Sequence, residues 1–216
     1  FIDIPTYQSR EAAYVPIQPT ISNVERPIDI IIGFDELIYV VDEAAEEIIS
    51  YDEALNELGR FYIKGVTSVT QTRDFNLLAI GKKDTLINGT NYSLSTIYRV
   101  NMAGANGYGL SNASITKKIT HPFYFKSSFS TTDAQVTFND IGILGNNNPG
   151  LNNRYYVSRS GPSANNAGQG PDDAVVLFDN SDKYISPVAV STSSGLYDNY
   201  FKKPFGLTSL CQPPQI

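Results

Sequence analysis

The sequence is short of several residue types, and each shortage excludes a class of site. Its 216 residues include no tryptophan, one cysteine and one histidine. The single Cys211 excludes an internal disulfide framework, and we interpret it as a small buried apolar residue. The single His121 excludes a histidine-based catalytic triad, and a metal site with several histidines, within these residues. No apolar run reaches the ~20 residues that a membrane-spanning helix needs, so we predict no direct membrane span.

The charge pattern excludes a further class of partner. The formal net charge is −6, and the lysines and arginines are scattered, so we expect no nucleic-acid-binding surface. No signal peptide is visible and the chain begins at Phe1, so we expect a removed N-terminal segment or a fragment. The abundance of Asn, Ser, Thr and Tyr is typical of exported proteins. We therefore predict an extracytoplasmic location, in the periplasm or at the cell surface.

The residues that are abundant favour an all-β fold. Tyrosine and phenylalanine number 14 and 11, and they lie among many short Val, Ile and Tyr runs. Four such runs follow one another within about 36 residues, separated by polar turn residues: Ile28–Ile32, Leu37–Asp42, Glu46–Tyr51 and Gly59–Ile63. This spacing predicts an up-and-down antiparallel meander, which is the size of one β-propeller blade.

A helix is the alternative for part of this stretch. Between Asp42 and Leu58, the segments EAAEE and DEALNEL have a helix-forming composition. Several apolar residues fall on one helical stripe: Ile48, Ile49, Tyr51, Leu55 and Leu58. The short polar segments would need packing support to stand as helices, so we favour the strands.

The amino-acid sequence of the same stretch resembles a blade of the NHL-type β-propeller family. The second strand of such blades ends in aromatic-Val-x-Asp, the third reads I-x-x-[FY]-D, and a glycine opens the fourth. The matching residues here are Tyr39, Val41, Asp42, Ile49, Tyr51, Asp52 and Gly59. The resemblance covers one blade well and two others loosely, and it implies a fold rather than a function.

The rest of the chain divides into comparable units. Residues 1–27 form a proline-containing leader that we expect to lie across the first blade or to link it to an upstream domain. Blades are predicted at about 28–63, 65–125 and 134–190, with a further first strand at Pro204–Gln212. The second blade is predicted to have strands at Val66–Gln71, Asn76–Ile80, Thr96–Met102 and Ile119–Phe125, with insertions at Lys82–Ser95 and Ala103–Lys118. The third is predicted to have strands at Val136–Leu144, Arg154–Ser158, Ala174–Asp179 and Ile185–Val190.

One aspartate position repeats between blades. Asp179 ends the AVVLFD strand as Asp52 ends IISYD. An Asp side chain at such a point accepts hydrogen bonds from nearby backbone N–H groups and sets the turn. We therefore expect Asp52 and Asp179 to hold equivalent turns.

Three blades and one further strand form an incomplete set, because propellers close with four to eight blades. An open array would leave an unpaired edge and an uncovered face at each end. The sequence thus predicts part of a larger propeller, with the later blades absent or on another segment. The alternatives are that another protein covers the open face, or that the strands form a β-sandwich.

Calcium is the one cofactor for which the sequence offers oxygen ligands. These ligands do not have the spacing of an EF-hand loop. The oxygen donors are Asp133, Asn139, Asp140, Asp172 and Asp173. Some related six-bladed enzymes hold a central metal on inner strands. By that resemblance alone, Asn139 and Asp140 lie where a metal ligand would sit. The other predicted inner strands offer a poor set of ligands, namely Asp29, Thr67 and Ser209. We therefore predict no metal, no other cofactor and no catalytic residues.

Two further features of the sequence are typical of binding surfaces. N-glycosylation spacing occurs at Asn88, Asn91 and Asn112, although such triplets arise by chance in a chain rich in Asn and Ser. Eight tyrosines could contribute to a contact patch, although packing within strands is the simpler interpretation: Tyr92, Tyr98, Tyr108, Tyr124, Tyr155, Tyr156, Tyr197 and Tyr200.

Together these patterns predict a non-catalytic β-propeller module that binds protein partners outside the cytoplasm. Its blade style and its Asn/Gly/Ser loops resemble cell-envelope propeller proteins of Bacteroidetes-type bacteria. That resemblance implies a protein partner in a transport or secretion complex at the outer membrane. The alternatives are a metal-dependent propeller lyase or hydrolase, and a carbohydrate-binding module.

Overall fold

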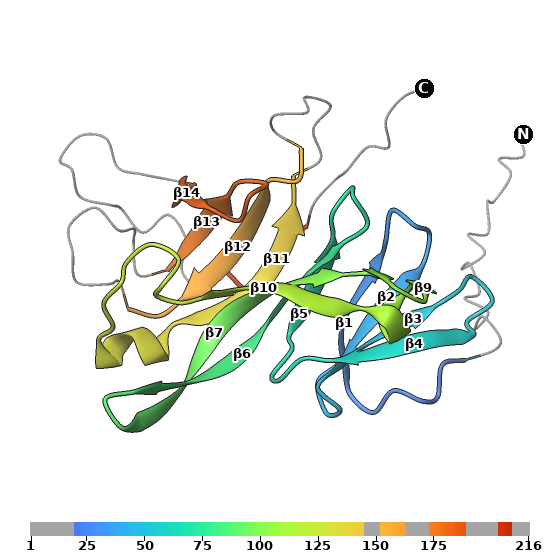
Figure 1. The fold of residues 1–216 in the computed structure, drawn as a ribbon, viewed down its shortest axis with the longest axis horizontal. Helices are drawn as coiled ribbons and strands as arrows, with labels where there is room; N and C mark the ends of the chain where they lie inside the picture. Colours follow the sequence, from blue (N-terminus) through green and yellow to red (C-terminus); the bar gives the residue numbers. More distant parts are fainter. Residues whose placement is uncertain (1–19, 145–151, 163–172, 189–202, 209–216) are drawn as a thin grey trace, which may run out of the picture.

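The computed structural model describes residues 20–144, 152–162, 173–188 and 203–208. These residues form an all-β protein with three four-stranded antiparallel sheets and one two-stranded sheet. Figure 1 shows the three large sheets side by side along the longest axis of the molecule. Within the described ranges, no helix is long and apolar enough to cross a membrane.

The first sheet contains the four strands that the sequence predicts. They are β1 (Pro27–Ile32), β2 (Ile38–Asp42), β3 (Glu47–Tyr51) and β4 (Glu57–Tyr62), paired in chain order. The helical alternative for residues 42–58 is wrong. The central strands β2 and β3 are almost entirely buried on both faces, which requires the continuous β-branched and aromatic runs found there.

The second sheet differs from the prediction in two places. Its strands are β5 (Ser68–Gln71), β6 (Leu77–Ile87), β7 (Thr90–Asn101) and β10 (Ser114–Thr120). The predicted fourth strand, Ile119–Phe125, is wrong beyond Thr120. There the chain turns, and the Phe125 N–H donates to the Pro122 carbonyl at 3.2 Å; Pro122 also lacks the N–H that a strand ladder requires.

The predicted insertion at Lys82–Ser95 is an extension of two strands. β6 and β7 continue their pairing as far as Ile87 and Thr90. Asn88 and Gly89 close the hairpin with φ values of 50° and 81°, the left-handed pair that a two-residue turn needs. The later insertion contains the short hairpin β8 (Ala103–Gly104) and β9 (Gly107–Tyr108), followed by the 3₁₀ helix η1 (Leu110–Asn112).

The third sheet follows the 3₁₀ helix η2 (Thr131–Gln135) and again pairs in chain order. Its strands are β11 (Thr137–Ile143), β12 (Tyr155–Ser160), β13 (Ala174–Phe178) and β14 (Tyr184–Pro187). All four predicted strands of this unit are therefore present. The further strand predicted at 204–212 is not assigned over residues 204–208, and residues 209–212 lie outside the described ranges, as does Cys211.

Side-chain oxygens set a five-residue turn that recurs in all three sheets. The N–H of Asn56 donates to Asp52, and that of Lys183 donates to Asp179, each at 2.8 Å. In the second sheet Thr72 takes the same role, accepting from the Asn76 N–H at 3.2 Å. The fourth residue of each turn has a φ value between 61° and 64°. The predicted equivalence of Asp52 and Asp179 is confirmed.

The second sheet is the middle layer of the molecule. Alternate residues of β6 face opposite ways, because successive side chains of a strand point to opposite faces. Leu77 and Ala79 pack with Tyr39 and Val41 of the first sheet, whereas Leu78 and Ile80 pack with the third sheet. The unbroken apolar run LLAI is therefore explained by apolar contacts on both faces of the second sheet.

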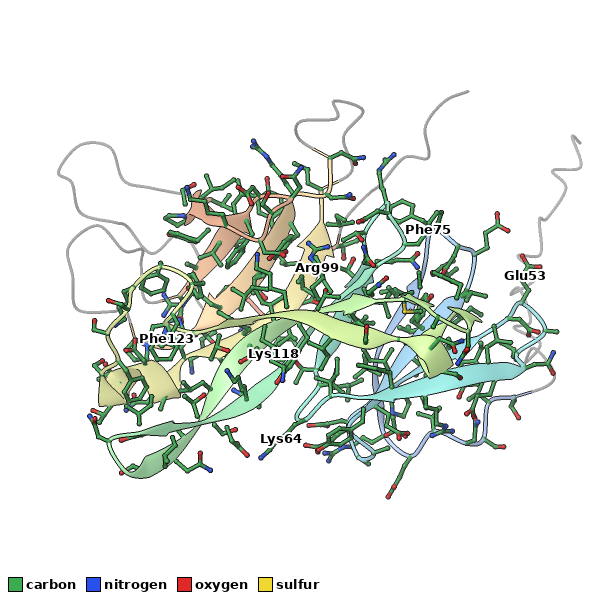
Figure 2. The ribbon with its side chains drawn as sticks, viewed as in Figure 1. Glu53, Lys64, Phe75, Arg99, Lys118 and Phe123 are labelled. Atoms are coloured by element: carbon green, nitrogen blue, oxygen red, sulfur yellow. The ribbon has the colours of Figure 1, made fainter. Side chains whose placement is uncertain are left out.

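An ion pair between a partly buried arginine and a buried aspartate also links the second and third sheets. The Arg99 guanidinium donates to both carboxylate oxygens of Asp182, with an Nη2–Oδ1 distance of 2.6 Å, and Lys117 lies 3.3 Å from Oδ2. Figure 2 shows Arg99 where these two sheets meet. Burial opposes ionisation of Asp182, but the hydrogen bond and charge of Arg99 outweigh it and lower the pKa of this carboxyl group.

Replacing Asp182 by Asn should lower the free energy of unfolding by about 3 kcal/mol, because the partly buried Arg99 then loses its buried counter-charge. Urea denaturation at pH 7 measures this change. Since the folded-state pKa of Asp182 is lowered, its stabilisation is present above the usual value of 3.8 and is lost as the pH falls through the folded value.

The matched control is Asp84→Asn, which removes an exposed pair with Lys64 whose Nζ–Oδ2 distance is 2.5 Å. Exposed pairs contribute little, so the urea midpoint should barely move. Equal losses in the two variants would show that Arg99–Asp182 does not hold the sheets together.

Candidate functional site

A hollow lies where the first strands of the three sheets converge. Its volume is about 820 Å³. Its walls are formed by residues 29–34, 69–71, 140–143 and 206–208. Each of β1, β5 and β11 stands at the end of its sheet, so each faces the hollow with a strand edge that no described strand pairs. Such edges are templates for binding another extended chain.

Three polar side chains link these first strands to one another. The Val69 N–H of β5 donates to Asp29 of β1 at 2.9 Å. The Ser68 hydroxyl of β5 donates to Asp140 of β11 at 2.5 Å. The other oxygen of Asp140 accepts the Leu207 N–H at 2.5 Å. A chain of side-chain hydrogen bonds therefore runs from β1 through β5 and β11 to residues 206–208.

Asp29, Ser68 and Asp140 hold comparable places in their strands. The pairing of β1 with β2 is interrupted between Pro27 and Asp29, and that of β11 with β12 between Phe138 and Asp140. Both aspartates therefore resume regular pairing immediately after a bulge, and bulges commonly redirect a side chain. Ser68 is the first residue of β5 to pair with β6.

The two carboxylates are close enough to affect each other. Burial raises the pKa of Asp29, while the hydrogen bonds from Val69 and Ser68 partly oppose this and the charge of Asp140 adds to it. At neutral pH the wall of the hollow therefore carries a carboxylate that burial makes harder to ionise. The site is suited to a ligand that presents N–H donors.

The far end of the hollow is closed by a second polar network. The Gln71 side chain is almost fully buried; it accepts from the Phe34 N–H at 2.5 Å and donates to Asp35 at 2.8 Å and to the Tyr108 hydroxyl at 3.0 Å. Burial, with the hydrogen bond to Asp35, raises the pKa of Tyr108 to about 12. Gly33 leaves the space this network needs, because a Cβ there would lie 2.5 Å from the Gln71 Oε1.

The predicted oxygen donors divide into two sets: a second hollow of about 360 Å³ is lined by Asp29, Thr67, Asn139 and Asp140, whereas Asp133 and Asp173 lie elsewhere. Asn139 donates to the Pro204 carbonyl at 2.7 Å, next to Asp140. Asp133 lies apart, with His121 and Lys126, and Asp173 accepts from the Gly161 and Lys203 N–H groups. Asp172 and Ser209 lie outside the described ranges. Across the part of the chain that the structure describes, no three His, Cys, Asp or Glu side chains are grouped as metal ligands.

His121 is completely buried, against Asp133 and the rings of Tyr124 and Phe125. Its Nε2 lies 3.3 Å from the Asp133 Oδ1. Burial, with the nearby charge of Arg159, lowers the pKa of His121 to about 3 in spite of Asp133. The imidazole is therefore neutral at physiological pH, and no ligand reaches it from outside.

The tyrosines are distributed over separate clusters. Tyr98 belongs to the core between the first two sheets, and Tyr155 to the core between the second and third. Tyr124 packs against that second core, and Tyr92 pairs with Phe129 at the β6–β7 hairpin. Tyr197 and Tyr200 lie outside the described ranges. Of the three glycosylation-type asparagines, Asn88 and Asn91 are exposed on that hairpin, and Asn112 lies in η1.

Sequence reasoning did not find Ser68 or Gln71. Nothing local marks either residue, since their partners lie 72 and 36 positions away. The only signal was their position, because Ser68 begins and Gln71 ends β5, the first strand of the second sheet.

Comparison with known proteins does not assign this chain to a family. No family model and no curated protein matches this chain. Among solved structures, the chain is similar to a protein of unknown function from Bacteroides caccae, with 14% identity and a TM-score of 0.46. The match covers 73% of this chain and 47% of that protein, so this chain spans about half of its length.

Replacing Asp29 by Asn should change how stability depends on pH. Because burial raises the folded-state pKa of Asp29, the wild-type protein should lose stability as the pH rises from the usual value of 3.8 through the raised value. Asn cannot ionise, so D29N should gain stability relative to the wild type over that range. Urea midpoints measured from pH 3 to pH 7 test this.

The control is Asp52→Asn, at an exposed turn where hydrogen bonds from Asn56 lower the pKa. Its stability difference from the wild type should move in the opposite direction with pH. A D29N difference that stays flat would mean that Asp29 is no harder to ionise in the folded protein.

Replacing Asp140 by Ala should release residues 204–208 from β11. The Leu207 N–H loses its acceptor, so its hydrogen exchange should accelerate while that of the β12–β13 ladder stays slow. Mass-spectrometric exchange on short peptides measures this. The D52N protein is again the control, and unchanged exchange at Leu207 in D140A would show that the carboxylate does not anchor this segment.

Proposed function

We propose that this chain is a non-catalytic binding or assembly module, built on a β-propeller of the NHL type, that holds protein partners outside the cytoplasm. The observation that carries the proposal is the hollow walled by three strand edges that no described strand pairs. Edge strands bind extended protein segments through main-chain hydrogen bonds, with side-chain pockets adding specificity.

The propeller proposal is supported by the repeated order of the sheets. Each has four strands paired in chain order, with the first strand at the hollow. Leu207 is joined to Asp140 as Val69 is joined to Asp29. The hydrogen bond that joins residues 204–208 to β11 thus resembles the one that joins β5 to β1, as a propeller with a further blade would require.

The hollow favours a protein ligand over a bound metal. Both oxygens of Asp140 already accept hydrogen bonds, from Ser68, Ile141 and Leu207. The Asp29 carboxylate accepts from Val69. An extended segment can use the strand edges and these carboxylates together without displacing the bonds that join the sheets. The proposed partner is an envelope protein, in a transport or secretion complex at the outer membrane.

Photocrosslinking tests this function directly. A photoreactive amino acid at Thr208, which is exposed and lines the hollow, should form an adduct with a protein of the source cell envelope. The matched control is the same amino acid at Glu53, which Figure 2 shows at the far edge of the first sheet. Glu53 should give no adduct of that mass.

The other function classes give different results in the same preparation. Stoichiometric calcium or zinc in the purified protein, lost in the D140A variant, would favour a metal-dependent enzyme. Glycan binding that survives chelator would favour a carbohydrate-binding module. Equal adducts at Thr208 and Glu53 would mean that the hollow is not the binding site.

A further inference from the structure

Strand β1 presents main-chain groups to the hollow along the edge that no described strand pairs. The Gly33 N–H donates to the Leu37 carbonyl at 2.8 Å, at the turn between β1 and β2. Residues that lie opposite each other in an antiparallel pair alternate between bonded and non-bonded positions. In the β1–β2 register, Ile32 and Ile30 therefore fall at non-bonded positions. Their N–H and C=O groups point away from β2, on the side of the hollow that both residues line.

The same alternation holds on the other two first strands. On β5 it directs the Val69 N–H away from β6, and this N–H donates to Asp29 at 2.9 Å. On β11 it directs the Ile141 N–H away from β12, and this N–H donates to Asp140 at 2.8 Å. At both positions the outward N–H group is thus already bonded to a carboxylate.

Strand β1 keeps outward groups that no described residue uses. Asp29 accepts the Ile30 N–H, as Asp140 accepts the N–H of Ile141. The Ile30 carbonyl, and both the N–H and the carbonyl of Ile32, have no hydrogen-bond partner among the described residues. An extended chain that lies along this edge would bond to all of these groups.

The side chains along the edge determine which residues such a chain would carry. Ile30 and Ile32 share one face of β1 and are exposed by 66% and 76%. Asp29 and Ile31 share the other face, where Ile31 packs against the core between the first two sheets. Side chains of an added strand lie beside those of the residues with which they pair, on the same face. Apolar residues at alternate positions of the added strand would therefore cover Ile30 and Ile32.

The intervening residues of the added strand would lie on the face of Asp29. Among the described residues that line the hollow, Asp29 and Asp140 are the ionisable ones, and none is a lysine or an arginine. The charge of Asp140 disfavours ionisation of Asp29. A cation beside Asp29 would relieve this repulsion, whereas a further carboxylate would add to it.

We propose that the partner adds an extended segment to β1 at Ile30–Ile32, and that apolar residues alternate with lysine or arginine along this segment. The inference rests on the binding function proposed for the hollow and names the chemistry of its ligand. Main-chain hydrogen bonds to the β1 edge supply affinity, and the alternating side chains supply specificity. Opposite charges across an interface favour the matching partner, and like charges reject the wrong one.

Labelled peptides test this pattern by fluorescence anisotropy. A hexapeptide that alternates valine with lysine should bind at least about tenfold more tightly than its valine–glutamate counterpart. It should also bind more tightly than a peptide with the same valines and lysines in separate blocks. Asp29→Asn should reduce the preference for lysine over glutamate. The matched control is Asp52→Asn, at an exposed turn of the same sheet, which should leave this preference unchanged.

N-methylation of the lysine peptide tests strand addition without altering the protein. Only alternate N–H groups of an added strand face its neighbour. Methylating the valine nitrogens or the lysine nitrogens should therefore abolish binding in one peptide and spare it in the other. Equal effects of the two methylations, or equal binding of the lysine and glutamate peptides, would overturn the proposal.

The photocrosslink at Thr208 separates this inference from the proposed function. An envelope-protein adduct at Thr208, together with equal binding of the lysine and glutamate peptides, would leave the function standing and overturn the proposed ligand chemistry. Saturable, lysine-selective binding without an adduct would support the site on β1 and contradict an envelope partner.

Discussion

The convergence of three strand edges on one hollow is the constraint that the rest of the molecule satisfies. Each first strand would leave its outer main-chain groups facing solvent or one another. Asp29, Ser68 and Asp140 accept or donate across the gaps and join consecutive first strands at 2.5 to 2.9 Å. Hydrogen bonds to a charged carboxylate are stronger than those between neutral groups. These polar contacts thus join the first strands at the centre of the molecule.

The apolar layers then determine how the outer strands pack. Because the second sheet packs on both faces, its central strands carry apolar residues at consecutive positions, as in Leu77 to Ile80. The outer faces of the molecule are different. Among the described residues, only the segment around Ile21 and Val24 packs on the outer face of the first sheet, and the exposed β1 isoleucines follow from this asymmetry.

Much of the fold could be predicted from the sequence, because strand periodicity and turn chemistry are local. The four runs between Ile28 and Ile63, and the turns at Asp52 and Asp179, depend only on neighbouring residues. The end of β10 was misplaced because the segment Ile119–Phe125 is rich in apolar residues. In the structure, the residues after Thr120 form the turn around His121 rather than a strand. The hairpin tip at Asn88-Gly89 carried a clear turn signal, but the polar residues around it resembled a loop.

The candidate site was less accessible to prediction for a physical reason. Asp140 was singled out as a metal donor, whereas in the structure it serves neighbouring sheets through Ser68 and Leu207. Such contacts join residues about 70 positions apart, and neither periodicity nor a motif records them. Only the relative placement of the sheets shows which polar side chains meet.

The recurring five-residue turn has a consequence for how the chain reaches this structure. A turn closed by the side chain of its own first residue, as at Asp52, Thr72 and Asp179, needs nothing from distant sequence. Each hairpin can therefore form while later residues are still being synthesised, and local contacts of this kind speed folding. The sheets would then assemble in chain order, with the first complete before the third emerges from the ribosome.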